Sequence, residues 1–266
     1  MNGKPTKSNS SSRSQTKPKT ETWIVIPDIH TSVSREHDEL SLGAVEQFMA
    51  SKRFDGYLNL GDLLDFVIIS SHNIGNLREV EGGRIFEEYK IADSILTRHE
   101  QIIRGNNPNA RMVYLEGNHE YRIERYLNVR PELEGMLEVD KCLHLKEHRI
   151  DWVRSWSRGE LFQLGNCFFH HGLYCNDHHA KKMVQRFNKN ILYGHCHDLQ
   201  IYTSYGVPAD NVLIGASLGC LCKIPQRYLR GGPTRWMQAI TIFQFEPATG
   251  HFTFNPIRIN NHKLIY

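Results

Sequence analysis

The sequence of 266 residues contains no uncharged apolar run of about 18 residues, the length that a membrane-spanning helix needs, so we expect no membrane contact. The N-terminal stretch has no apolar segment that could act as a secretory signal, and we therefore expect a cytoplasmic location. The six cysteines have no CxxC spacing, which predicts reduced thiols. The net charge of +3 is too small to predict a broadly basic nucleic-acid-binding surface.

The first 20 residues lack any bulky apolar side chain after Met1. Such a segment cannot bury enough surface to offset the entropy lost on ordering, so residues 1–20 are predicted to form a disordered tail. Five Lys and Arg side chains lie in this tail before the first acid, Glu21. A solvated leader is favoured over a nucleic-acid tether, although the sequence does not decide the role of these charges. The remaining residues, 21–266, are predicted to form one domain.

What the sequence does have is an unusual number of histidines, fifteen, several of which follow short apolar runs. These runs predict buried strands at 23–26, 57–60, 112–115, 167–170, 191–193 and 212–214. Helices are predicted at 39–51 and 121–129, a mostly helical stretch at 66–105 with a Gly82-Gly83 interruption, and a C-terminal hairpin from 239–245 and 251–259. Residues 131–160 have no sustained periodicity. Alternating strands and helices predict α/β layers with polar residues at the strand ends.

Polar residues with the chemistry of metal ligands follow the first two strands. Asp28 and His30 are two positions apart, so extended geometry would aim both side chains at one point and form half of a divalent-metal site. Gly61 precedes Asp62 at the second strand, where glycine permits close backbone approach and the aspartate could bridge two ions. Asp65 lies three residues further on, and a helix cap is the alternative role for it.

The later strands end in the same way. Asn118 and His119 follow the third strand, and because neighbouring extended residues face opposite sides, one is expected to bind metal and the other to meet substrate. His171 follows the fourth strand, and His195 and His197 follow the fifth with a spacing that predicts a shared direction. The last two could instead hold a structural zinc with the cysteine between them, but no other cysteine is spaced to complete that site.

The ordered series of strand ends, D-x-H, G-D, G-N-H-E, H-G and G-H-x-H, spans residues 23 to about 220. In this order and with no motif missing, the series resembles the signature of the calcineurin-like metallophosphoesterase superfamily. The resemblance implies a four-layer α/β/β/α metallophosphoesterase sandwich with a helical insertion. We expect substrate specificity to be built in residues 66–105 and 131–160, because loops over a rigid scaffold usually carry it.

The resemblance also implies a role for each residue. Two sets of three side chains would each hold one metal ion; they are Asp28, His30 and His197, and Asn118, His171 and His195. Asp62 would bridge the two divalent ions, with Mn favoured and Fe or Zn also compatible with the mixed oxygen and nitrogen donors. His119 resembles the family's catalytic histidine that binds no metal, and Asp65 resembles the acid that orients it.

The implied reaction is hydrolysis of a phosphoester by a hydroxide that two cations about 3.5–4 Å apart activate. His119 is expected to act as an imidazolium that stabilises the developing charge and protonates the leaving oxygen. Asp65 is expected to fix the tautomer of His119 and to raise its pKa.

Two departures favour a branch of the superfamily outside the protein phosphatases. Those enzymes typically carry an arginine soon after the second aspartate, whereas Phe66-Val67 follow Asp65 here, and they lack the G-H-x-H form. Enzymes that hydrolyse lipid-A precursors typically have arginine at the position of His119. Phosphodiesterases, repair nucleases and bacterial or phage enzymes remain, and for a phage enzyme the expected location is the host cytoplasm.

A phosphodiester, either a nucleotide or a nucleic acid, is therefore the expected substrate, with a phosphomonoester or a phosphoprotein as alternatives. Four arginines could contact phosphate, with a solvated helix face as the competing interpretation for each; they are Arg78, Arg84, Arg122 and Arg125. Tyr121 could stack on a base or lie in the core. A non-catalytic metal-binding scaffold is the alternative of another class, and the sequence decides neither the exact substrate nor the oligomeric state.

Overall fold

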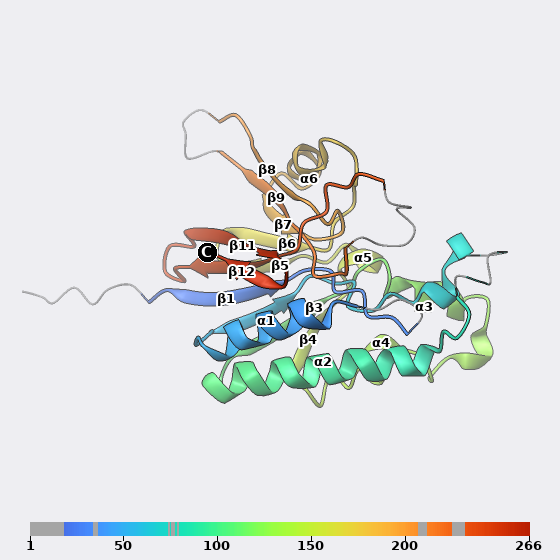
Figure 1. Ribbon diagram of the computed structural model, residues 1–266. Helices are drawn as coiled ribbons and strands as arrows, with labels where there is room; N and C mark the ends of the chain where they lie inside the picture. The colour runs from blue at the N-terminus through green and yellow to red at the C-terminus, as the bar shows by residue number, and fades with distance from the viewer. Residues whose placement is uncertain are drawn as a thin grey trace, which may run out of the picture.

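The computed structural model describes residues 19–33, 37–73, 75, 78, 80–206, 212–224 and 232–266. The predicted disordered tail lies outside the described residues except for its last two positions. The described residues form two β-sheets and several helices, which confirms the mixed α/β class predicted from the sequence (Figure 1). No helix among them is both long enough and apolar enough to cross a membrane.

The first sheet has seven strands in the order β12-β11-β10-β1-β2-β3-β4. Their bounds are β1 Glu21–Ile26, β2 Gly56–Asn59, β3 Arg111–Leu115, β4 Ile150–Val153, β10 Ala239–Phe245, β11 Phe252–Asn260 and β12 Lys263–Ile265. Strands β1 to β4 pair in parallel, and the C-terminal strands extend the sheet from β1 by antiparallel pairs.

The second sheet has five strands in the order β5-β6-β7-β9-β8. Their bounds are β5 Phe162–Leu164, β6 Cys167–His170, β7 Asn190–Tyr193, β8 Leu199–Thr203 and β9 Ile214–Leu218. Strands β6, β7 and β9 are parallel, and β5 and β8 form antiparallel edges.

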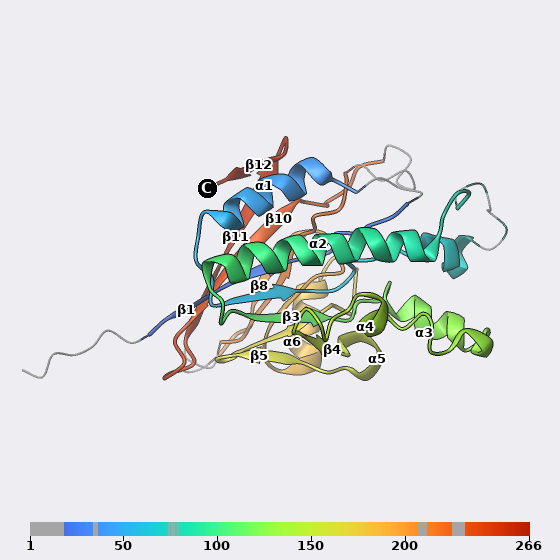
Figure 2. The same ribbon diagram turned by 90° about the horizontal axis from the view of Figure 1, so that it is seen from below.

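The α-helices are α1 Glu39–Ala50, α2 Ile85–Asn106, α3 Tyr121–Leu127, α4 Val139–Cys142, α5 Ser155–Arg158 and α6 His179–Phe187. Short 3-10 helices are η1 Val67–Ile69, η2 Ser71–Asn73 and η4 Pro131–Leu133. Helices α1 and α2 lie side by side on one side of the first sheet, and α6 lies at the second sheet (Figures 1 and 2).

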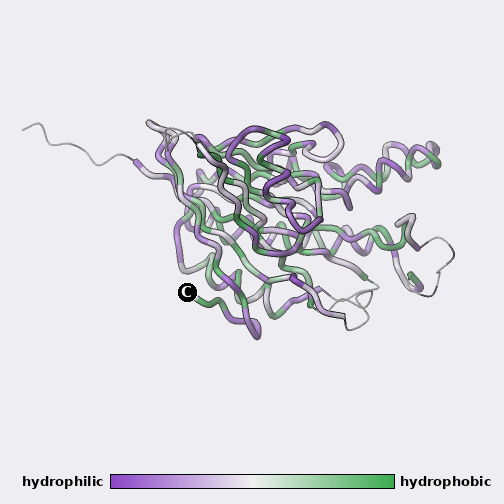
Figure 3. Tube along the Cα trace, turned by 90° about the horizontal axis from the view of Figure 1, so that it is seen from above, coloured by the Kyte–Doolittle hydropathy of each residue, from purple (hydrophilic) through white to green (hydrophobic). Residues whose placement is uncertain are grey.

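Strand β1 shows why the first apolar run has no polar face. Its alternate residues point to opposite sides of the sheet. Ile24 and Ile26 join the core beneath helices α1 and α2, whereas Trp23 and Val25 join a second core that contains residues of both sheets. A third core unites α6 with β7. Hydrophobic and hydrophilic stretches consequently interleave along the chain (Figure 3).

One predicted strand is misplaced. Strand β9 is Ile214–Leu218, so the strand predicted at 212–214 overlaps it only at Ile214. The described part of the stretch 66–105 is mostly helical, as predicted, and the predicted Gly82-Gly83 interruption lies just before α2, where Gly82 has a positive φ of 80°. Strands β4, β5, β8 and β12 were not predicted.

Candidate metal centre

The seven predicted metal ligands come together where strands β1, β2, β3, β6 and β7 end. Parallel neighbours end at the same edge of a sheet, so the loops that follow them meet there. Among the described residues, His, Asp and Cys side chains form four groups that could each hold an ion, and two adjoining groups consist of predicted ligands only: Asp28, His30 and His197, and Asp62, His171 and His195. Another group joins His30 with Asp65 and His119, which were predicted not to bind metal. Asn118 joins the second group through its Oδ1, which lies 3.0 Å from Nε2 of His171.

The first group has the geometry of ligand atoms that share a cation. Nε2 of His30 lies 3.1 Å from Nε2 of His197, and Oδ1 of Asp28 lies 3.4 Å from the same nitrogen of His197. The second oxygen of Asp28 is buried and has no hydrogen-bond partner. A buried carboxylate oxygen without a donor is costly, and a cation would satisfy it.

In the second group, a hydrogen bond to the backbone determines which nitrogen of His171 faces the other ligands. Nδ1 of His171 donates to the carbonyl oxygen of Leu60 at 2.8 Å, which leaves Nε2 free to bind a metal. That Nε2 lies 3.3 Å from Oδ2 of Asp62. The same carboxylate oxygen lies 3.7 Å from Nε2 of His30, so Asp62 sits between the two groups.

The backbone at these loops is left-handed at four of the predicted ligands. The φ angles are 54° at His30, 50° at Asp62, 69° at His195 and 62° at His197. Asp28 and His30 join one group, as predicted, although His30 is left-handed and not extended. The shared direction predicted for His195 and His197 is wrong, because the two rings join different groups. Non-glycine residues with positive φ are uncommon and cluster at functional sites, where the surrounding structure holds them.

The backbone at Gly61 lies close to the neighbouring loops, as predicted. Its φ is 101°, and a Cβ built there would lie 2.7 Å from Nδ1 of His171 and 2.8 Å from the backbone nitrogen of Gly117. Any larger residue would separate the loops that carry Asp62 and His171.

The electrostatics keep the bridging candidate ionised. Burial raises the pKa of Asp62, but the neighbouring rings of His119, His171 and His30 more than offset it, so the pKa lies well below its usual range. Burial lowers the pKa of His171, but Asp62 outweighs it and raises that pKa to about 10. The two groups thus form an ion pair, and a cation bound at Nε2 of His171 would take the place of the proton on that ring.

His119 lies beside the ligands and contacts two charged partners. Its Nδ1 lies 3.0 Å from Oδ1 of Asp65 and 2.9 Å from the carbonyl oxygen of the same residue. Its Nε2 accepts from Nη2 of Arg122 at 2.9 Å. The ring is therefore a neutral tautomer that carries its proton on Nδ1, as expected from Asp65.

The expected imidazolium at His119 does not fit this environment. Burial lowers the pKa of His119 below 6.5, and Arg122 and His30 lower it further, so the rise caused by Asp62 and Asp65 is outweighed. The solvated-face interpretation of Arg122 is wrong, because its Nη1 also donates to the carbonyl oxygen of Asp65 at 2.6 Å. Arg125 is exposed on α3.

Two buried glutamates support the loops, and the sequence analysis assigned them no role. Glu120 accepts from the backbone nitrogens of Asp62 at 2.9 Å and Gly117 at 2.8 Å. It also accepts from the nitrogen of Leu64 at 3.1 Å and from the hydroxyl of Tyr114 at 2.7 Å. The G-N-H-E motif was the signal for this residue.

Glu88, on helix α2, also accepts hydrogen bonds from the backbone of the loop that follows β2. Its Oε1 accepts from the backbone nitrogen of Asp65 at 2.9 Å and also from that of Phe66. Burial, followed by the charge of Asp65, raises the pKa of Glu88 to about 8. No local motif marks this position, because only the packing of α2 brings it to the loop.

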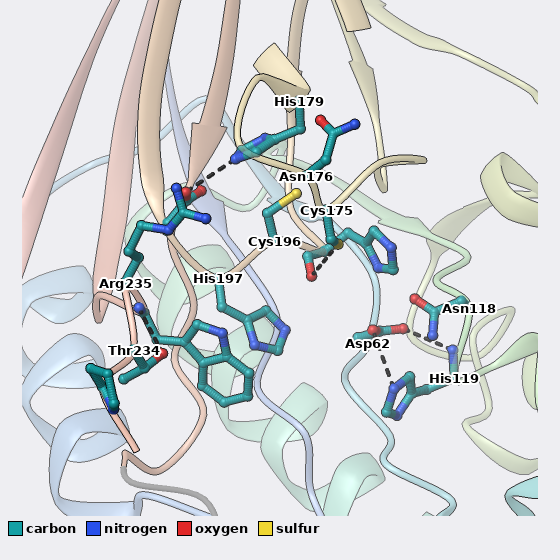
Figure 4. A pocket seen from close by; sticks show the side chains of 14 residues that line it. Asp62, Asn118, His119, Cys175, Asn176, His179, Cys196, His197, Thr234 and Arg235 are labelled. Atoms are coloured by element: carbon teal, nitrogen blue, oxygen red, sulfur yellow. Dashed lines mark hydrogen bonds and ion pairs between the residues drawn. The ribbon is translucent and has the colours of Figure 1, made fainter. Parts of the chain in front are cut away.

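Four of the proposed ligands line a cleft of about 410 Å³ together with Trp236 (Figure 4); they are Asp62, Asn118, His195 and His197. The ring centroid of Trp236 lies 4.2 Å from that of His197. Trp156 lies outside this cleft, with its ring centroid 5.2 Å from that of His195. In Figure 4, Asp62, Asn118 and His119 lie together at one side of the cleft, and Arg235 lies at the other.

The alternative of a structural zinc at His195-Cys196-His197 finds no support. The two rings belong to separate groups, and the thiol of Cys196 donates to the carbonyl oxygen of Tyr174 at 2.7 Å. Cys220 and Cys222 do lie with His197 in a further group that could hold an ion, because β9 returns to this edge, but this group includes neither His195 nor Cys196. All six cysteines are free thiols.

Comparisons with known proteins add little. No protein-family model matches the chain. No curated protein matches it either. Among solved structures, the crystal structure of Pseudomonas putida nuclease MPE is similar at 14% sequence identity and a TM-score of 0.39, over 83% of each chain. This likeness is too distant to bear on what the present chain does.

Proposed function

We propose that this protein is a dinuclear metal-dependent hydrolase (EC 3.1 type) of the calcineurin-like metallophosphoesterase superfamily that cleaves phosphodiesters. The observation that supports this proposal most is the position of Asp62. Its Oδ2 lies 3.3 Å from Nε2 of His171 in one ligand group and 3.7 Å from Nε2 of His30 in the other. The four-layer α/β/β/α order, one domain at 21–266 and a cytoplasmic location belong to this proposal.

The donor set fits the implied ions. Carboxylate and amide oxygens combined with imidazole nitrogens suit Mn, Fe or Zn, and we take Mn as the first choice. One ion would be held by Asp28, His30 and His197. The other ion would be held by Asn118, His171 and His195, and Asp62 would bind both ions. Bound there, the ions would lower the pKa of a water molecule and neutralise phosphoryl oxygens.

The chain's own residues would orient the reaction. The ring of His119 is fixed by Asp65 on one side and by Arg122 on the other. Its Nε2 lies 3.8 Å from Oδ2 of Asp62, within reach of a phosphate held at the ligands. When phosphate attracts the guanidinium of Arg122, Nε2 of His119 would be free to take up a proton from water. The resulting imidazolium, paired with Asp65, would pass that proton to the leaving oxygen and return to the neutral ring.

The competing functions use the same site differently. A phosphomonoesterase or protein phosphatase would share the ligands, and a metal-binding scaffold would share them without turnover. The contacts of His119 favour an enzyme, because Asp65 and Arg122 hold both nitrogens of this ring beside the proposed ligands, and a scaffold has no need of such a positioned histidine.

Metal analysis together with an assay tests the proposal. We expect two ions per chain after Mn²⁺ loading and Mn²⁺-stimulated hydrolysis of bis-p-nitrophenyl phosphate that exceeds hydrolysis of p-nitrophenyl phosphate. Two ions without turnover would favour the scaffold, and preferred turnover of the monoester would favour a phosphomonoesterase. An inert protein with one zinc would overturn the proposal.

A further inference from the structure

A second cleft of about 990 Å³ adjoins the metal centre and shares Asn118 with it. Its walls come from η1, η2, the start of α2, the helix α3 and the helix α5, which lie towards one end of the molecule (right in Figures 1 and 2). Both segments expected to carry specificity therefore contribute, the first through residues such as Ile68 and Ile85 and the second through Trp156.

The charged residues that are described in the lining of this cleft are all basic. Its lining includes Arg122, Arg125 and Arg130 and, among the residues that the structure describes, no acid. Arg122 is held by Asp65 and His119, and Arg130 lies 3.6 Å from Glu132.

Arg125 is different from both. It is exposed, and no carboxylate within the described part of the chain pairs with it. Acidic residues gather instead in another cleft on the far face of α3, where Arg154 is the one basic residue among the described lining; the acids are Glu116, Glu120, Glu124, Glu134, Glu138 and Asp140. The helix thus separates an acidic surface from a basic one, and an anionic ligand is favoured on the basic side.

Planar rings line the basic cleft as well. Tyr121 and Tyr126 lie on α3, and Trp156 faces them from α5. The ring of Trp156 lies 5.8 Å from His171 and 5.2 Å from His195, so the cleft begins directly at the metal ligands. Aromatic rings interleaved with arginines bind stacked bases and the phosphates between them.

We propose that this cleft binds the nucleotides next to the scissile phosphate of a single-stranded nucleic acid, with Arg125 on a neighbouring phosphate. The inference rests on the proposed function, since the metal centre would hold the scissile phosphate. A cyclic mononucleotide has no second phosphate for Arg125, and an apolar aryl or lipid substituent would leave Arg125 without a partner. The cleft therefore selects a strand over these smaller diesters.

Binding of a fluorescein-labelled oligothymidylate to the full chain, without added metal, tests the cleft directly. We expect Arg125→Ala to weaken binding about tenfold and to reduce the slope of log affinity against log salt by about 0.7, the contribution of one phosphate contact on a single strand. Arg125→Lys should keep most of that slope. Arg149→Ala removes the same charge from an exposed site outside the cleft and should change neither quantity.

Kinetics complete the test. In Mn²⁺, the ratio of kcat/KM for the oligonucleotide to kcat/KM for bis-p-nitrophenyl phosphate should fall about tenfold in Arg125→Ala. An unchanged ratio and salt slope would overturn the inference, as would a wild-type chain that prefers a cyclic nucleotide. Hydrolysis of bis-p-nitrophenyl phosphate without oligonucleotide binding would overturn only the inference. Arg125-dependent binding by a chain that holds no ions and hydrolyses nothing would overturn only the proposed function.

Discussion

The guanidinium of Arg122 donates from Nη2 to Nε2 of His119 at 2.9 Å, and this contact closes the side of the ring that Asp65 does not hold. Both ring nitrogens of His119 are therefore engaged by protein groups, while the ring itself lies against His30 at a centroid distance of 4.5 Å. His119 is positioned next to the proposed metal centre without being one of its seven ligands.

Replacement of His119 by Gln should preserve metal content and remove most turnover. The seven proposed ligands are other residues, so ion binding should not need this ring. Proton transfer by a positioned side chain typically contributes about 10²–10⁴-fold. Inductively coupled plasma mass spectrometry and steady-state kinetics on the same sample check this. Loss of metal together with activity would show that His119 is a ligand.

Replacement of Arg122 by Ala should lower kcat by about tenfold to a hundredfold with unchanged metal content, because the ring of His119 loses one of its two supports. Arg122→Lys should recover part of the loss through its charge, but it lacks the planar fork that reaches both Asp65 and His119. Arg149→Ala serves as the control for removal of an arginine elsewhere. Wild-type kcat in Arg122→Ala would contradict this role.

Replacement of Glu120 by Ala should destabilise the protein by about 3 kcal/mol, since three backbone nitrogens and the hydroxyl of Tyr114 lose their buried acceptor. The expected fall in Tm is about 5–10 °C for a chain of this size. Circular dichroism measures it, with the exposed Glu132→Ala as the matched control. Equal Tm values for the two variants would show that Glu120 is dispensable for the loops.

The clustering of the seven proposed ligand residues could be predicted from the sequence because each follows a short apolar run. The runs before Asp28, Asp62 and Asn118 form buried strands β1, β2 and β3, and parallel strands bring their ends together. The conformation of those ends could not be predicted. His30 and Asp62 adopt positive φ, which residue type alone does not indicate in a non-glycine residue.

The residues that support the site were harder to find than the ligands. Glu88 reaches the backbone of Asp65 from 23 positions away, through the packing of α2 and not through any local pattern. Arg122 resembles a solvated helix residue in sequence, and only the fold shows that it contacts His119. The short edge strands β5 and β12 were missed because three residues give too little periodicity.

A buried histidine outside the site gives a prediction on pH. His99 is fully buried, its Nε2 has no hydrogen-bond partner, and burial followed by the charge of Arg98 lowers its pKa from 6.5 to about 3. Between these values the unfolded chain binds a proton that the folded chain does not, so stability falls as the pH falls through this window.

His99→Phe should remove this contribution, which reaches about 1.4 kcal/mol per pH unit. The free energy of unfolding in urea, measured between pH 6.5 and 4, should therefore depend less steeply on pH in the variant than in the wild type. His251→Phe, which changes an exposed histidine, is the control and should keep the wild-type slope. Parallel curves for His99→Phe and the wild type would contradict the prediction.

Anomalous diffraction from Mn²⁺-loaded crystals, with Asp62→Asn beside the wild type, tests the proposed metal centre most directly. The wild type should show two peaks about 3.5–4 Å apart on either side of the Asp62 carboxylate. Asp62→Asn should lose at least one peak and nearly all hydrolysis of bis-p-nitrophenyl phosphate. A single peak in the wild type, a peak only at His197, Cys220 and Cys222, or an active Asp62→Asn with both ions would contradict it.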